Sequence, residues 1–214
     1  MRSVIISLVA LVGGTTAANA TLSISSTDYG LAAPAGASAV VDFDDPTYAG
    51  FSLTGSGYNL VTGTFSDSSA PADGPLNSDR DTTKYLSVYN GAATLLGTVG
   101  YSSVSLFWGS VDDYNWLDLL DADGNVFDTV SYADIGAGSN GDQLASNTNR
   151  RVDIASTQAI YGLQFRSTQA AFEADNIAFS GAVPEPASWA LMLGGFGMIG
   201  GALRSRRKAA VTFA

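Results

Sequence analysis

The sequence predicts an all-β protein, and three features of residues 21–182 support that prediction. Apolar residues recur there with a period of two, as in Ser103–Trp108, and no stretch of about 11 residues shows a helical period. The apolar runs are short and are separated by Gly, Asp, Asn and Ser, which is typical of antiparallel sandwiches. Of the 19 acidic residues in this region, 18 are Asp, which favours turns over helix interiors and strands. We therefore expect one β-sandwich domain over residues 21–182, long enough to bury a sizeable core.

The first element, Met1–Ala20, has the features of a secretory signal peptide. Arg2 supplies a positive charge, Val4–Val12 is an apolar stretch, and Ala18–Ala20 form an A-x-A cleavage site. A buried N-terminal helix is the alternative interpretation. We therefore expect an exported protein whose mature chain begins at Thr21.

The expected strands follow in chain order, each a short run of β-branched, aromatic or alternating apolar residues. They are Val40–Phe43, Phe51–Leu53, Lys84–Tyr89, Ala93–Thr98, Ser103–Trp108, Trp116–Leu120, Val126–Ser131, Arg151–Ala155, Ile160–Phe165 and Asn176–Phe179. The longest stretch without strand character, Ser66–Arg80, consists largely of Ser, Asp, Pro, Gly and Asn. It predicts a surface loop.

A second hydrophobic segment, Ala187–Leu203, contains 17 residues without charge, including five Gly. This length is at the short limit for a membrane-spanning helix, and lipid tolerates Gly in a helix better than water does. A basic stop follows, which should remain cytoplasmic. It consists of Arg204, Arg206, Arg207 and Lys208. We therefore predict a transmembrane helix over residues 187–203, and a buried core helix is the alternative.

Immediately before this helix, the chain contains a Pro-Glu-Pro-x-x-Trp-Ala motif. It is formed by Pro184, Glu185, Pro186, Trp189 and Ala190. With the hydrophobic segment and the basic stop, residues 183–208 resemble the PEP-CTERM sorting signal of Gram-negative bacteria, also called the ice-binding protein C-terminal domain. The resemblance implies processing by an exosortase-like membrane protease. It also implies anchoring in the inner membrane before processing, and then a place at the cell surface or in the extracellular matrix.

A second resemblance covers about half of the predicted sandwich. It rests on Leu106–Asn115, on the Asp-x-x-Gly of Asp121–Gly124, and on Phe172–Phe179 with its Asp-Asn-Ile run. These segments are similar to a family of exosortase-dependent surface proteins. That family implies a jelly-roll-like sandwich and a surface location, but little chemistry.

The composition of the whole chain excludes several classes of chemistry. The 214 residues include no Cys and no His. Disulfides, thiolate metal sites, Ser-His-Asp triads and His-ligated zinc or haem are therefore impossible. The net charge is −10, and it is −14 over residues 21–182, where 19 acidic residues accompany five basic ones. This charge disfavours binding to nucleic acid.

Two groups of acidic residues are candidate ligands for Ca²⁺, the one cofactor that we consider. Alternate oxygen ligands before a Gly turn suit a hard cation, as in Asp121, Asp123 and Asn125, although no EF-hand Glu follows. The same residues also suit a β-hairpin turn between apolar strands. In the second group, Asp42 or Asp44 from an early strand would pair with Asp175 from the last strand. Solvated loop carboxylates are the alternative for this group.

Three aromatic residues surround the turn at Asp112 and Asp113. Trp108 follows Leu106 by two residues, so we expect it to point into the core. Tyr114 and Trp116 are candidate ligand-binding residues, because aromatic rings beside Asp and Asn can stack on sugars. Packing in the core is the alternative.

Three functional hypotheses follow. We favour a non-catalytic surface or extracellular-matrix protein that an exosortase sorts and that associates with exopolysaccharide. A carbohydrate- or calcium-binding adhesion module is the second hypothesis. An exported glycoside hydrolase is the third hypothesis. We rank it last, because the sequence contains no distinct pair of carboxylates that could act on a glycosidic bond.

Overall fold

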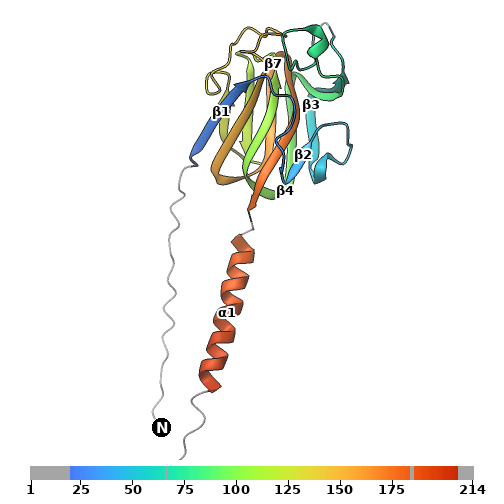
Figure 1. The fold of residues 1–214 in the computed structure, drawn as a ribbon. Helices are drawn as coiled ribbons and strands as arrows, with labels where there is room; N and C mark the ends of the chain where they lie inside the picture. Colours follow the sequence, from blue (N-terminus) through green and yellow to red (C-terminus); the bar gives the residue numbers. More distant parts are fainter. Residues whose placement is uncertain (1–19, 66, 184–185, 207–214) are drawn as a thin grey trace, which may run out of the picture.

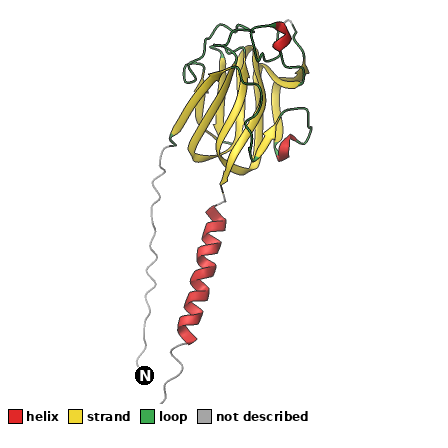
Figure 2. Cartoon of the chain, in the orientation of Figure 1, coloured by secondary structure: helices red, strands yellow, loops and turns green. Residues whose placement is uncertain are grey.

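The computed structural model describes residues 20–65, 67–183 and 186–206. Apart from Ala20, the predicted signal peptide lies outside these residues. The described body is an antiparallel β structure (Figure 2), as the sequence predicts. Its strands are β1 (Leu22–Asp28), β2 (Ala39–Val41), β3 (Ser52–Thr62), β4 (Lys84–Gly109), β5 (Asn115–Leu120), β6 (Val126–Ser131) and β7 (Arg150–Val183). Two short 3-10 helices, η1 (Tyr48–Gly50) and η2 (Asn77–Asp79), and the helix α1 (Pro186–Arg206) complete the fold.

The strands form two layers because β4 and β7 are long enough to contribute to both (Figure 1). The first layer has the order β1–β7–β4–β7–β2. Its middle strand places Val104 opposite both Ile154 and Phe179. The second layer has the order β3–β4–β7–β5–β6, in which Leu163 lies opposite both Leu95 and Leu119. Six of the predicted strands are thus parts of two continuous strands.

One hydrophobic core lies between the layers. The first layer contributes Leu106 and Trp108 to it, and the second contributes Leu95 and Phe165. The burial of Trp108 confirms the inward direction predicted for it. Burying each large side chain stabilises the fold by about 1.5–3 kcal/mol. The alternation of apolar and polar residues that predicts strands therefore also determines which side of each strand faces the core.

The predicted surface loop at residues 66–80 is partly buried. Ser68–Ala72 pack against the sandwich and are buried. The backbone N–H of Ser69 donates to Glu173 Oε1 over 3.0 Å, and that of Ala72 donates to Asn149 Oδ1 over 3.3 Å. Buried backbone groups need such partners, so these polar side chains hold the loop against the sandwich.

The helix α1 forms where the sequence predicts a C-terminal helix, and it projects away from the sandwich (Figure 1). Leu193 is 70% exposed and Phe196 is 68% exposed, which excludes the alternative of a buried core helix. The prediction that residues 187–203 span a membrane is not supported: within the described ranges, no helix combines the length and the apolar character that crossing requires.

Candidate functional site

A polar pocket of about 200 Å³ lies among the loops at one end of the sandwich. We call it the Glu173 pocket. Asp112 and Tyr114 come from the turn between β4 and β5, Asn140 and Gln143 from the connection between β6 and β7, and Glu173 from β7 itself. Loops from distant parts of the chain thus bring polar side chains to one point.

Glu173 is the most strongly perturbed group of this pocket. Its side chain is buried, Ser110 Oγ donates to Oε2 over 2.5 Å, and the backbone N–H of Ser69 donates to Oε1. Burial, with a smaller contribution from the charge of Asp112, raises the pKa of Glu173 to about 8. The two hydrogen bonds of this carboxyl group link the loop before β4 and the turn after β4 to β7.

The structure places the two candidate aromatic residues in different surroundings. Tyr114 lines the Glu173 pocket, and its hydroxyl donates to the carbonyl of Ala170 over 3.0 Å. Trp116 lies on β5, where the guanidinium of Arg166 sits 5.4 Å from the ring centroid in a cation–π contact. A sugar stacking on that face of Trp116 would have to displace Arg166. Tyr114 lines the Glu173 pocket, whereas Trp116 does not.

A second cavity, of about 440 Å³, is acidic. We call it the acidic cavity. Its lining includes Asp42 and Asp44 from the loop after β2, Asp73 and Asp81 from the loop before β4, and Asn176 from β7. Asp42 and Asp44, two of the predicted calcium ligands, thus line this cavity, whereas Asp175 is not part of its lining. Asp73 and Asp81 were not predicted. The sequence alone does not distinguish a loop Asp that lines a cavity from a loop Asp that faces solvent.

The carboxyl of Asp175 lies buried beside this cavity. Burial, followed by a side-chain hydrogen bond with Asp81 and then by the negative charges of Asp81 and Asp42, raises the pKa of Asp175 to about 10. Asp175 Oδ2 accepts a hydrogen bond from Asn176 Nδ2 over 3.2 Å, whereas Oδ1 has no hydrogen-bond partner. A buried carboxylate oxygen without a partner is costly, so this group calls for a further ligand.

The other group of acidic candidates forms a tight turn. Asp121 Oδ1 accepts the backbone N–H groups of Asp123 and Asn125 over 3.0 and 2.8 Å, and Gly124 has a φ of 80°. These contacts are those of an Asx turn, which supports the hairpin alternative. In the described part of the chain, no three acidic side chains are arranged around one point where a metal ion could bind.

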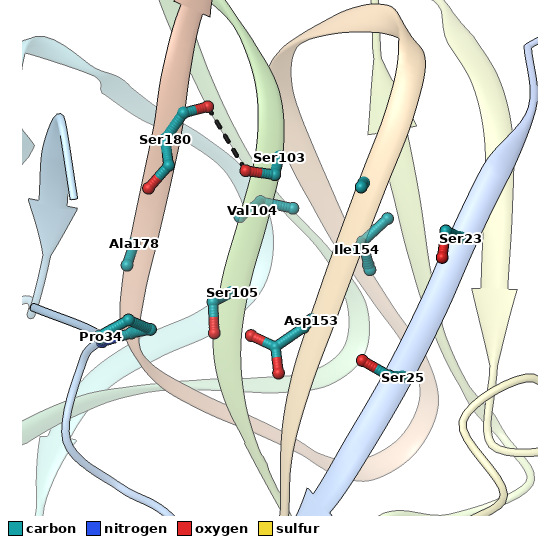
Figure 3. A pocket seen from close by; sticks show the side chains of 11 residues that line it. Ser23, Ser25, Pro34, Ser103, Val104, Ser105, Asp153, Ile154, Ala178 and Ser180 are labelled. Atoms are coloured by element: carbon teal, nitrogen blue, oxygen red, sulfur yellow. Dashed lines mark hydrogen bonds between the residues drawn. The ribbon is translucent and has the colours of Figure 1, made fainter. Parts of the chain in front are cut away.

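The outer face of the first layer carries a groove of about 270 Å³ that the sequence analysis did not identify (Figure 3). We call it the serine groove. Ser23 and Ser25 of β1, Ser103 and Ser105 of β4, Ser180 of β7 and the carboxylate of Asp153 line it. Alternation places these polar residues outside because their neighbours, such as Val104 and Ile154, belong to the core. The signal in the sequence was the Ser at every second position of these strands.

The serine groove offers several hydroxyl groups at its surface. Ser103 Oγ donates to the carbonyl of Ser180 over 3.5 Å (Figure 3), and Ser105 Oγ accepts from Arg151 Nε over 2.8 Å. Ser23 and Ser25 are exposed on the outermost strand of the layer. Hydroxyl groups beside a carboxylate can donate to and accept from a polyhydroxylated ligand.

Residues 182–208 match the PEP-CTERM protein-sorting motif. The chain carries this sorting signal. The match confirms the resemblance predicted from the Pro-Glu-Pro motif and the segment that follows it. Of these residues, Pro186 begins α1, Trp189 and Ala190 lie within α1, and Arg204 and Arg206 lie in its last turn. Pro184, Glu185, Arg207 and Lys208 fall outside the described residues.

Two solved structures are similar to parts of the chain. CsCBM6-3 from Clostridium stercorarium, solved in complex with cellobiose, is 15% identical with a TM-score of 0.36, covering 67% of this chain and 93% of that one. The enzymatically active domain of tailspike protein 4 from bacteriophage CBA120 is 14% identical with a TM-score of 0.27, covering 77% of this chain and 19% of that one. Neither likeness is close enough to carry a functional argument. No curated protein sequence matches the chain.

Proposed function

We propose that this protein is an exported surface or extracellular-matrix protein of a Gram-negative bacterium, sorted by an exosortase, and that its sandwich associates with exopolysaccharide without catalysing a reaction. The sorting motif at residues 182–208 carries the proposal. It begins at the end of β7, the last strand, and α1 projects away from the sandwich. Cleavage near Pro184 would leave all seven strands intact, so the body could be released in its folded form.

The serine groove supports the association with exopolysaccharide. Its hydroxyl groups lie across neighbouring strands of one layer, and Asp153 adds a strong acceptor for sugar hydroxyls. The groove lies on a sheet face, where an extended chain has room to lie. This observation also favours a second candidate function, a carbohydrate-binding adhesion module, which differs from the first in requiring a specific glycan.

The chemistry of the Glu173 pocket supports a body without catalysis. A glycoside hydrolase requires two carboxyl groups that flank a sugar bond. Glu173 and Asp112 both line this pocket, but both oxygens of Glu173 already accept hydrogen bonds, from the backbone N–H of Ser69 and the hydroxyl of Ser110, so its carboxyl group is not free to act on a sugar bond.

The sorting signal is tested by replacing Pro184, Glu185 and Pro186 with Ala in a chain tagged after Ala214. We expect export to continue and the tagged full-length chain to accumulate in the inner-membrane fraction, because the processing enzyme no longer recognises its site. Cell fractionation with antibodies to the body and to the tag measures both. Thr212→Ala, outside the motif, is the matched control and should be processed like the wild type. Efficient loss of the tag and arrival at the surface in the triple variant would refute sorting through this motif.

A further inference from the structure

Two buried carboxyl groups face each other beside the acidic cavity. Asp175 of β7 is 0% exposed and Asp81, three residues before β4, is 6% exposed. Asp81 Oδ1 accepts from the N–H and the hydroxyl of Thr83 over 2.8 and 2.5 Å, whereas Asp81 Oδ2 has no partner. Asp175 likewise has one oxygen bonded, to Asn176, and one oxygen without a partner. Each carboxyl group therefore has one buried oxygen without a partner outside the pair, and the two side chains lie close enough to share a hydrogen bond.

The nearby basic groups do not neutralise this pair directly. Arg151 lies close enough for its charge to act on Asp175. Its N–H groups, however, donate to Ser105 and to the carbonyls of Leu31 and Asn176. Arg80 lines the same cavity. Its guanidinium, however, donates to Ser69 Oγ, to the carbonyl of Ala70 and to Gln143 Oε1. Two buried carboxyl groups this close cannot both be ionised unless a cation binds between them, and without a cation they share a proton.

We propose that Asp81 and Asp175 bind one Ca²⁺ ion at the inner wall of the acidic cavity. The two unpartnered oxygens are carboxylate oxygens, the ligands that Ca²⁺ prefers, at about 2.3–2.6 Å from the ion. Asp42, which lines the cavity and whose charge reaches Asp175, adds negative charge on the open side. Neutral oxygens and water would have to complete the coordination, because the described residues contain no group of three acidic side chains arranged around a metal ion.

The ion would join parts of the chain that are far apart in sequence. Asp42 follows β2, Asp81 precedes β4 and Asp175 belongs to β7. Binding to the folded state alone stabilises that state. This role is independent of the sorting signal, so the failure of either proposal leaves the other standing.

The test measures Ca²⁺ binding to the purified full-length protein after treatment with a chelator. Equilibrium dialysis with radioactive Ca²⁺ alone should find one ion for each chain. Thermal unfolding at about 10 mM Ca²⁺, above the dissociation constants of roughly 0.1–1 mM typical of extracellular modules, should give a melting temperature higher by about 3 °C or more than NaCl of equal ionic strength. Asp175→Asn should abolish the bound ion and the shift.

A second measurement separates a lost ligand from a lost fold. Asn has nearly the size of Asp and an amide N–H that can donate to Asp81 in place of the shared proton, so without Ca²⁺ Asp175→Asn should melt at or above the temperature of the wild type. Asp121→Asn, in the hairpin turn, is the matched control and should bind Ca²⁺ as the wild type does. If the wild type binds no ion at about 10 mM Ca²⁺, or if Asp121→Asn loses the ion while Asp175→Asn keeps it, the proposed site is wrong. The buried pair would then share a proton.

Discussion

Trp108 of β4 and Phe172 of β7 stack with their ring centroids 4.3 Å apart and their planes 14° from parallel. Phe165 meets the other side of this pair edge to face, with centroids 5.4 Å apart. Phe172 lies where β7 passes from one layer to the other. It pairs with Val88 in the second-layer part of β4, and its neighbour Glu173 pairs both with Ser87 there and with Gly109 in the first-layer part of β4. The aromatic stack therefore sits at the junction of the two layers.

This position predicts a large loss of stability on truncation. We expect Phe172→Ala to lower the free energy of unfolding by about 3–5 kcal/mol, because it removes buried area and the stacking contacts and leaves a cavity. Urea denaturation measures the loss. Phe65→Ala, at a side chain that is 55% exposed, is the control and should change stability by less than about 0.5 kcal/mol. Equal effects of the two substitutions would show that the stack does not join the layers.

A second prediction concerns Asp118 of β5 and Arg166 of β7. Asp118 is buried and accepts from Arg166 Nε and, over 2.8 Å, from Arg166 Nη2, while Thr129 Oγ1 donates to it over 2.7 Å. Arg166→Met leaves a buried carboxylate with one partner. We expect this substitution to lower the free energy of unfolding by about 2–3 kcal/mol. This is less than the cost of breaking a fully buried pair, because the Arg166 side chain is 39% exposed.

The matching double variant tests the cause of that loss. Asp118→Leu combined with Arg166→Met removes both charges, so it should cost less than Arg166→Met alone. A double-mutant cycle in urea gives the coupling energy between the two positions. Additive effects would mean that Arg166 stabilises the protein through its contact with Trp116 and not through Asp118.

The sequence predicted the strands better than their continuity. Gly91 lies between two of the predicted strands, Lys84–Tyr89 and Ala93–Thr98, and Gly162 lies within a third, Ile160–Phe165. In the structure each lies within a long strand where another backbone comes very close. A Cβ added at Gly91 would lie 2.3 Å from the carbonyl oxygen of Ser56, and one at Gly162 would lie 2.3 Å from that of Leu95. Such close approach depends on strand pairing, which a single sequence does not reveal.

The candidate sites show the same limit. The sequence predicts that Asp42 or Asp44 from an early strand pairs with Asp175 from the last strand; Asp42 lines the acidic cavity and its charge acts on Asp175. Asp81 could not be predicted, since its burial results from packing of the loop before β4. The strand Leu22–Asp28 was also missed, although Leu22 and Ile24 alternate with Ser. Without that edge strand, the Ser residues of the serine groove could not be assigned to one face.

The last prediction concerns the serine groove and rests on the proposed association with exopolysaccharide. Asp153 is the acidic residue of this groove, and its carboxylate can accept hydrogen bonds from sugar hydroxyls. We expect Asp153→Ala to weaken retention on exopolysaccharide from the source bacterium by about tenfold, the loss of a charge-assisted hydrogen bond of roughly 1.5 kcal/mol. Affinity electrophoresis of the purified protein measures the retention.

Two further variants locate the binding surface. Asp128→Ala removes a carboxylate from β6 in the second layer and should leave retention unchanged, which controls for the loss of negative charge. Tyr114→Phe removes the hydroxyl from the Glu173 pocket and tests the other candidate surface. If Tyr114→Phe weakens retention while Asp153→Ala does not, the ligand binds among the loops at the end of the sandwich. The serine groove would then be only the polar outer face that strand alternation requires. Hydroxyl groups on an exposed face form hydrogen bonds with water as readily as with a sugar.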